Sequence, residues 1–456
     1  MTQFKIILLC LLGMSLTMVQ AQQTCNLQIC LNEALQNNHN LKKSQLDRDK
    51  STQARKEVLG ALLPQVSGSA NLTDNIQKSK FIMPNFLAEF LPASMLGDYT
   101  AEYMEIEMGL NYSAGVGVAM NQQILNMSLF NAVKIAETAQ HMAALGVESK
   151  EEDIIIQTAN IFYAIQVTNY ALSQFDKSIE LIGRMLETME TSYANGIIKK
   201  VDLDRLKVTK TNLETQRSAI LNAVEVQKNL LKLQMGKSMN QSIEVDPINL
   251  TFFESKTVEI DGYNFDINLQ TPYKLMIQQK NIGELQKKSA LYESLPVITL
   301  TMNYNYNYLA NELFSGDDYT YPNSMAILSM KVPIFSGLSR TAKLKQANFE
   351  RLKIQEDIST LEQSLNMAYL NASMKLEDSR KTIKSQKENL TLAQEVYNIT
   401  EMNYQQGIAS MSDVLNASSS LIQSQVNYAD ALNNYMKAWL ELKKANGTIR
   451  ELTAKQ

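Results

Sequence analysis

The sequence is poor in the residues that loops, metal sites and catalytic centres usually need. Its 456 residues include only 17 glycines, 8 prolines, 3 cysteines and 2 histidines. Scarce glycine and proline disfavour a loop-rich enzyme and favour long uninterrupted elements. The few histidines and cysteines leave little material for a metal site or a histidine-dependent catalyst.

An excess of positive charge is also missing. The net charge is −4, which argues against nucleic acid as the main partner. Apolar residues make up 45% and charged residues 20%, a balance typical of neither a disordered polymer nor a polytopic helical membrane protein. A transmembrane helix needs about 18 consecutive apolar residues, and the sequence after the N-terminal segment contains no such run.

Sequence motifs of common enzymes are absent too. There is no phosphate-binding loop, no G-x-S-x-G, no H-E-x-x-H and no dinucleotide-binding glycine pattern. His39 and His141 stand alone, and Ser418 to Ser420 is better explained as a helix face than as a nucleophile cluster. We therefore predict no catalytic residue, no bound metal and no cofactor, and a protein that is not an enzyme.

The first 21 residues are typical of an export signal. Lys5 precedes a mostly apolar stretch from Ile6 to Val19, and Val19-Gln20-Ala21 resembles a cleavage site. Its removal would leave Cys25 and Cys30 in an oxidising compartment. Their spacing matches no zinc or redox motif. A local disulfide and two inert apolar residues both fit, although helical geometry is expected to hold the two thiols apart.

Six segments have the apolar spacing of three and four that is typical of helices. They are 31–63, 128–194, 201–235, 272–295, 339–406 and 412–446. The second runs for about 67 residues, or roughly 100 Å of helix. Helices of this length are rare in a compact globule and indicate coiled-coil-like packing.

Strict alternation of apolar and small polar residues occurs four times. The long copies are Glu105 to Asn121 and Thr299 to Leu309, and the short ones are 66–73 and 326–332. Period two predicts strands with two different faces. A soluble sandwich is one interpretation. Long strands that come in pairs joined by long helices favour a membrane barrel, with apolar residues facing lipid and small polar residues facing the lumen.

Two further patterns belong to this barrel. Tyr304, Tyr306 and Tyr308 share one strand face, with Tyr319 and Tyr321 across a short loop, which predicts an aromatic band at the membrane interface. Residues 81–96 form an apolar loop. This loop either packs on the outer edge of the barrel or folds inward and narrows the exit.

The chain repeats itself. Tyr193 to Ile197 and Asp202 match Tyr404 to Ile408 and Asp413 at a constant offset of 211 positions, and the same offset pairs Gly236 with Gly447. This indicates a tandem duplication. The predicted organisation is a signal peptide (1–21), a first repeat (22–236), a connecting equatorial segment (237–271), a second repeat (272–447) and a tail (448–456).

Four strands are too few to close a barrel, and an open edge does not survive in lipid. The chain must therefore oligomerise. Two copies would give eight strands around a filled interior, and three would give twelve with room for water. The helices of each repeat stack into columns that would continue the barrel as a tube.

At this level the sequence resembles the TolC family of outer-membrane efflux channels. The resemblance covers essentially the whole mature chain, and it is most specific in the duplicated layout, in Leu31 to Leu41 and in Tyr404 to Ala417. It implies a mostly α protein with β strands: a homotrimeric duct with a 12-stranded outer-membrane barrel, four strands per protomer, continued by a periplasmic helical barrel.

The resemblance also implies function and partners. The duct would lie in the outer membrane of a Gram-negative bacterium and extend into the periplasm, in contact with membrane lipid. It would join a periplasmic adaptor (a membrane fusion protein) and an inner-membrane pump, and passively export drugs, other amphiphiles or proteins. A rod-like periplasmic adaptor is the alternative, but it does not explain four two-sided strands.

Residue roles follow from the same resemblance. The hairpin turns are where an adaptor docks, which implies contacts at Gly196, Ile197, Gly407, Ile408 and Met411. Asp413 falls on an acidic ring at the periplasmic entrance, with a raised pKa expected from mutual repulsion, and Asn416 replaces the second acidic residue.

The closing latch is expected at the same turns. Tyr404 matches a tyrosine that hydrogen-bonds the aspartate at Asp202. Ala409 replaces the arginine of a second link, and Lys199, Lys200 or Arg205 are candidates to compensate.

Overall fold

The computed structural model describes residues 24–86, 102–250, 265–313, 316 and 318–453. The chain divides into two compact units. One comprises residues 1–49, 141–279 and 355–456, and the other residues 50–140 and 280–354. The predicted signal peptide lies outside the described residues, and the domain boundaries given above stay predictions.

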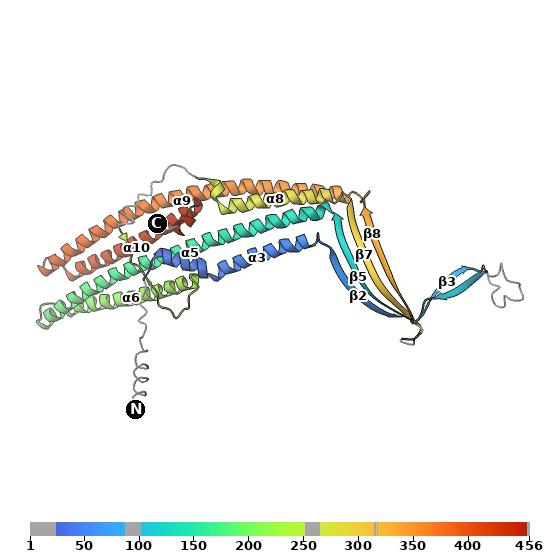
Figure 1. The fold of residues 1–456 in the computed structure, drawn as a ribbon. Helices are drawn as coiled ribbons and strands as arrows, with labels where there is room; N and C mark the ends of the chain where they lie inside the picture. Colours follow the sequence, from blue (N-terminus) through green and yellow to red (C-terminus); the bar gives the residue numbers. More distant parts are fainter. Residues whose placement is uncertain (1–23, 87–101, 251–264, 314–315, 317, 454–456) are drawn as a thin grey trace, which may run out of the picture. The chain divides into compact units, whose positions relative to one another are not determined.

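The second unit is built around one antiparallel sheet. Its strands are β2 (Gln65–Asp74), β5 (Tyr112–Leu125), β7 (Val297–Ala310) and β8 (Tyr319–Lys331), in the order β2-β5-β7-β8 (Figure 1). The two repeats meet at the centre, where β5 of the first pairs with β7 of the second. Within the described chain β2 and β8 each have a neighbour on one side only, so both outer edges are unpaired.

The register gives the sheet two different faces. Val118 lies opposite Tyr304, whereas the next residue, Gly117, lies opposite Asn305. Tyr304 is 56% exposed and lies on the apolar face. On the polar face there is no room for a larger residue at 117, because a Cβ there would come within 2.0 Å of Asn305 Oδ1. The predicted alternation is thus confirmed for these strands.

The predicted strand from Glu105 to Asn121 is wrong as a single element. β4 (Tyr103–Met108) is followed by Gly109, which has a φ of 95°, and β5 begins at Tyr112. β4 pairs with β3 (Ser79–Pro84) in a separate two-stranded sheet. The beginning of the expected apolar loop is therefore strand, because Phe81 to Pro84 pair with β4. The part of that loop from residue 87 onward lies outside the described residues.

The register also separates the tyrosines that the sequence groups together. Tyr321 lies opposite Asn307 and Tyr319 opposite Leu309. These two positions belong to the face of the asparagines, not to the face of Tyr304 and Tyr306. The pairing register, which local sequence does not specify, decides this division.

The helices match the predicted segments closely. They are α2 (Leu27–Asn37), α3 (His39–Gly60), α5 (Met127–Ala194), α6 (Lys200–Gln234), α8 (Thr271–Tyr292), α9 (Ser339–Gln405) and α10 (Met411–Ala445). The exception is the predicted helix 31–63, which is two helices broken at Asn38. The Asn38 side chain accepts the Asn40 N–H at 2.8 Å and donates to the Gln234 carbonyl at 2.8 Å. It therefore starts α3 and fastens it to the end of α6.

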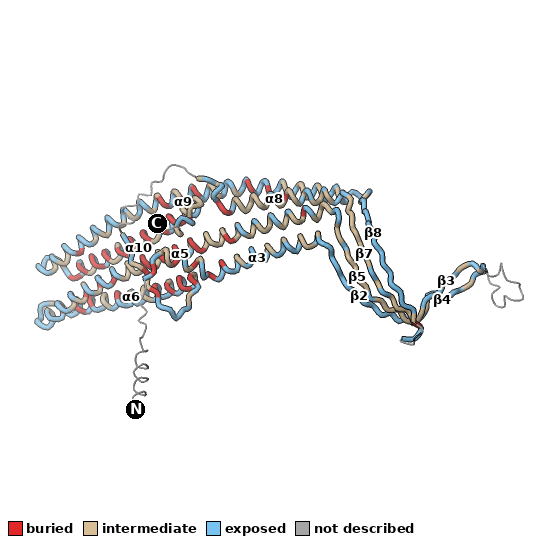
Figure 2. The backbone as a smooth tube through the Cα atoms, viewed as in Figure 1, coloured by how far each residue is buried: buried red, intermediate tan, exposed pale blue. Residues whose placement is uncertain are grey.

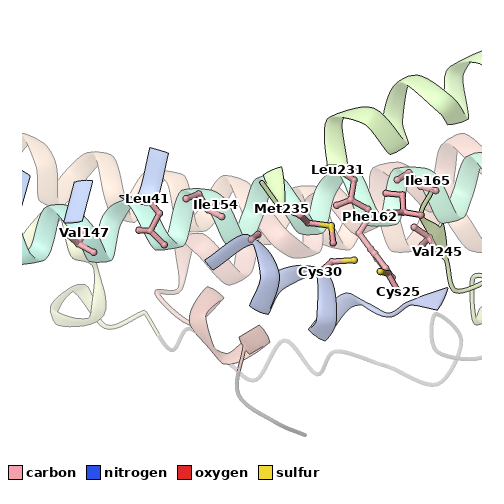
Figure 3. Packing of buried hydrophobic residues seen from close by; sticks show 12 residues of the cluster. Cys25, Cys30, Leu41, Val147, Ile154, Phe162, Ile165, Leu231, Met235 and Val245 are labelled. Carbon is pink, nitrogen blue, oxygen red and sulfur yellow. The ribbon is translucent and has the colours of Figure 1, made fainter. Parts of the chain in front are cut away.

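Buried residues concentrate in the first unit, above all along α10 and the matching part of α5 (Figure 2). One cluster joins α2, α5 and α6 through residues such as Phe162, Leu231 and Met235 (Figure 3). Helices α5 and α6 form one long hairpin, and α9 and α10 form the other. A second cluster lies between these two hairpins near their turns and includes Ile182, Leu206 and Val414.

The connecting segment is fastened to the same unit. β6 (Glu244–Val245) pairs in parallel with β1 (Thr24–Cys25). Lys228 of α6 is 9% exposed and its Nζ lies 2.9 Å from Glu244 Oε1. Two short 3-10 helices, η1 (Ile267–Leu269) and η2 (Ile449–Thr453), complete the described elements of the unit.

Candidate functional site at the helical turns

The two helical turns have the same backbone structure, as expected for duplicated segments. Gly196 and Gly407 have φ of 73° and 75°, a left-handed conformation that favours glycine. The N–H groups of Ile197 and Ile408 reach back to carbonyls five residues earlier, at 2.9 and 2.8 Å. This closure of a helix C-terminus satisfies carbonyls that would otherwise lack a partner. Both turns lie at the same end of the first unit (Figure 1).

Four of the five predicted contact residues are exposed. Ile197 is 73% and Ile408 72% exposed, and the two glycines beside them are exposed as well. Met411 departs from the prediction, because it is 4% exposed and packs into the cluster between the hairpins. Its side chain therefore supports the second turn from inside and is not available on the surface.

Asp413 is held in a capping box. Its carboxylate accepts the Ser410 N–H at 2.9 Å, and the Ser410 hydroxyl oxygen accepts the Asp413 N–H at 3.2 Å. Hydrogen bonds from the Ser410 hydroxyl and N–H stabilise the charged form, so the pKa of Asp413 lies below its ordinary value. The raised pKa expected from repulsion between three copies concerns the assembled ring and stays a prediction.

Arg205 connects the two hairpins. Its Nη1 donates to Ser412 Oγ at 2.9 Å, which ties α6 to the first turn of α10. The same nitrogen lies 4.0 Å from the Asp202 carboxylate. Arg205 is one of the three cations that the sequence offers for the missing second link. Ser412 is not among the predicted site residues, and its only sequence signal is its place directly before Asp413.

Tyr404 lies near Asp202 but its hydroxyl donates elsewhere. The hydroxyl donates to Met189 Sδ at 2.9 Å. Burial raises the pKa of Tyr404, and the nearby charge of Asp202 adds to this. The hydrogen bond predicted between Tyr404 and Asp202 is thus replaced within the described chain by one to Met189, a residue without any sequence signal for this role. Asn416 is exposed one turn further along α10.

The described residues hold no group of three or more His, Cys, Asp or Glu side chains placed to bind a metal ion. Among them, no helix is long and apolar enough to cross a membrane.

Comparison with known proteins relates this arrangement to one family. The family model described as outer membrane efflux protein matches residues 30–233 and 286–448. The chain is 23% identical to outer membrane protein TolC of Escherichia coli (strain K12), covering 97% of this chain and 86% of that protein. It is 21% identical to the protein of the same name from Vibrio cholerae, with 93% and 91% covered.

Solved structures share the fold. The outer membrane protein VceC from Vibrio cholerae superposes with a TM-score of 0.71 at 17% identity, covering 92% of this chain and 96% of that one. The open state of the MtrE outer membrane channel of Neisseria gonorrhoeae gives 0.69 at 14% identity, with 94% and 91% covered. The fold is therefore that of the TolC-like channels, with its internal duplication.

Proposed function

Because the chain belongs to the outer membrane efflux protein family and is thus an outer-membrane efflux channel protein, we propose that three copies form the exit duct of a tripartite efflux or type I secretion system. The duct passively conducts small amphiphiles, drugs or proteins. A periplasmic adaptor docks at the hairpin turns and connects it to an inner-membrane pump. The two-faced sheet with unpaired outer edges is the observation that supports this proposal. The alternative, a rod-like periplasmic adaptor, does not account for such a sheet.

The sheet requires other copies of itself. β2 and β8 carry unpaired backbone groups along 10 and 13 residues, which lipid cannot satisfy. Pairing β8 of one copy with β2 of the next removes both edges. Three copies give twelve strands, enough to leave a water-filled interior.

Exposed apolar side chains next to these edges also favour contact with a second copy of the chain. Ile334 and Phe335 begin three residues after the end of β8 and are 94% and 81% exposed, and Leu63, two residues before β2, is 63% exposed. When β8 pairs with β2 of the next copy, the segment after β8 comes to lie beside the segment before β2. The two apolar segments then cover each other.

The helix α9 also presents an uncovered apolar stripe in the first unit. Its members form two groups with spacings of three and four, and the groups lie 18 residues apart, which is five helical turns, so all share one face of the helix. They are Met367, Leu370, Met374, Leu392, Val396 and Ile399, each exposed. Two such apolar groups on one face are typical of a helix that another helix covers, and in the proposed trimer a neighbouring copy supplies that helix.

We expect the purified protein to run in detergent as a species of about 150 kDa, three times the 51.4 kDa of one chain. In planar bilayers it should form water-filled pores. Light scattering with correction for detergent and single-channel recording measure these properties. Replacing both Ile334 and Phe335 with serine should shift the protein from trimer toward monomer. A monodisperse monomer that is soluble without detergent would contradict the proposal.

The gate is placed at the turns. Asp413 is exposed at the start of α10. In the trimer, the three copies of Asp413 would form a ring of carboxylates around the axis, and Asn416 would lie one helical turn further along α10. Arg205 and Tyr404 link the two hairpins beside that ring, through Ser412 and Met189, and Asp202 lies next to Arg205. The exposed positions Gly196, Ile197, Gly407 and Ile408 are left for the adaptor, with Met411 supporting them from within.

A ring of carboxylates binds multivalent cations, so we expect such cations to block the pore from the turn side. Asp413→Ala should weaken that block at least several-fold in single-channel recordings. Ser410 lowers the pKa of Asp413 in one protomer and repulsion between three carboxylates raises it in the ring, so block should fade as pH falls through the pKa of the ring. Ser410→Ala is the matched control, since it disturbs the cap and keeps the carboxylate. Unchanged block in Asp413→Ala would leave Asp413 as a helix cap only.

A further inference from the structure

The first two described residues and the start of α2 bring two cysteines together. Asn26 is the cap of α2, and its side chain accepts the Ile29 N–H at 2.9 Å. Cys25 is therefore the residue before the cap, and Cys30 is the fourth residue of the helix. Side chains at these two positions pack against each other over the start of a helix. The prediction that helical geometry separates the thiols is wrong, because the helix begins at Leu27 and leaves Cys25 outside.

The pair is enclosed in the core. Cys25 is 5% and Cys30 0% exposed, and both belong to the cluster of Phe162, Met235 and Val245 (Figure 3). Both are free thiols in the structure, and they are hydrogen-bonded to each other. No other described cysteine exists, so each thiol has one possible partner within the described chain.

The environment makes the two thiols chemically different. The hydrogen bond from Cys30 lowers the pKa of Cys25 to about 7, against an opposing effect of burial and with help from the nearby charge of Lys237. The same hydrogen bond and burial raise the pKa of Cys30. Cys25 is accordingly the thiol with substantial thiolate at neutral pH, and thiolate is the form that attacks disulfides.

We propose that Cys25 and Cys30 form a disulfide in the exported protein. The oxidant is a protein disulfide of the thiol–disulfide exchange class, which an oxidising extracytoplasmic compartment supplies. The proposal requires export to the outer membrane, and it does not require the channel, gate or adaptor roles.

The reaction takes two exchange steps. The Cys25 thiolate attacks one donor sulfur, which breaks the donor disulfide and releases one donor thiolate. Cys30 then loses its proton and its sulfur attacks the Cys25 sulfur of the mixed disulfide, expelling the second donor sulfur. The chain loses two protons and two electrons in total, and the donor takes them up and leaves as a dithiol. Because both thiols are buried in the folded unit, the donor reaches Cys25 when the two-residue strand β1 separates from β6.

The bond would act locally. It closes a loop of only six residues, so it restricts the unfolded chain far less than a long-range disulfide. Its effect is to join strand β1 directly to helix α2. β1 has only two residues and one neighbour, β6, so the bond prevents this short strand from fraying.

Thiol trapping tests the proposal on the full-length chain, exported in a bacterial host and extracted with its membrane. The protein is denatured without reductant in the presence of iodoacetamide and digested with trypsin. Both cysteines lie in the one peptide that ends at Lys42. Without reductant, we expect neither cysteine of this peptide to be alkylated and the peptide to be two hydrogens lighter than its dithiol form. After reduction, we expect both cysteines to be alkylated. Alkylation of both cysteines without reductant would overturn the proposal.

Two controls complete the test. In Cys25→Ser, Cys30 should react without reductant, which shows that the reagent reaches it. The chain lacking residues 1–21 stays in the reducing cytoplasm and should show both thiols free. Hydrogen exchange is the second readout: Cys25→Ala with Cys30→Ala should speed exchange at residues 24–26 several-fold and leave α10 unchanged. Identical exchange in the exported wild type and the double variant would contradict the fastening role.

Discussion

Met302→Arg should abolish most of the assembled protein in the outer membrane, whereas Asn303→Arg should be tolerated. The two residues are neighbours near the middle of β7, and the register places Met302 with the apolar face and Asn303 with the asparagine face. An arginine that faces lipid at mid-depth costs about 2–4 kcal/mol per copy, and an arginine in a wet lumen costs little. Three copies multiply this penalty in the assembled barrel.

The measurement is the yield of trimer in outer-membrane extracts, resolved on gels without heating. Because both substitutions introduce the same side chain at nearly the same depth, any difference between them reports the sheet face on which the arginine lies. Val118→Arg and Ser113→Arg test the same two faces on β5 at two different depths. Equal tolerance of Met302→Arg and Asn303→Arg would mean that the apolar face is not turned toward lipid.

Arg205→Ala should raise the open-to-closed ratio of the pore about tenfold. The Arg205–Ser412 hydrogen bond holds α6 against α10 at the turns, and the Arg205 side chain is about half exposed. An exposed link of this kind contributes about 0.5 kcal/mol. Three links in a trimer contribute about 1.5 kcal/mol, which corresponds to roughly a tenfold change in an equilibrium. Single-channel conductance and open probability measure the change.

The chain offers a matched control on the same helix. Arg217 of α6 pairs with Asp176 of α5, which belongs to the same hairpin, so this pair does not join the two hairpins. Arg217→Ala should leave conductance unchanged. Ser412→Ala should reproduce Arg205→Ala, and the double variant should add nothing further. If Arg205→Ala and Arg217→Ala behave alike, the link between the hairpins does not hold the closed state.

Helices were predictable from this sequence because their signals are local. The spacing of apolar residues and the scarcity of glycine and proline place α5, α9 and α10 to within one residue at most ends. The break at Asn38 was missed because no glycine or proline marks it. An asparagine side chain makes it instead, by bonding to α6 almost two hundred residues away.

The candidate site was predictable in part. The duplicated glycines locate both turns, and their exposed neighbours follow from the turn geometry. The partners of Arg205 and Tyr404 did not follow, because they lie on the other hairpin. The burial of Met411 and the lowered pKa of Asp413 likewise depend on how the second turn packs and caps its helix.

By itself the sequence determined the element types, the tandem duplication and the two-faced character of the strands, since periods of 2 and 3.6 and a constant offset are properties of the chain alone. Only the tertiary structure decided the register that divides the tyrosines between two faces, the separate hairpin of β3 and β4, and the pairing of Cys25 with Cys30. These features depend on which backbone groups meet across space, and local propensity carries no information about residues that are distant in the chain.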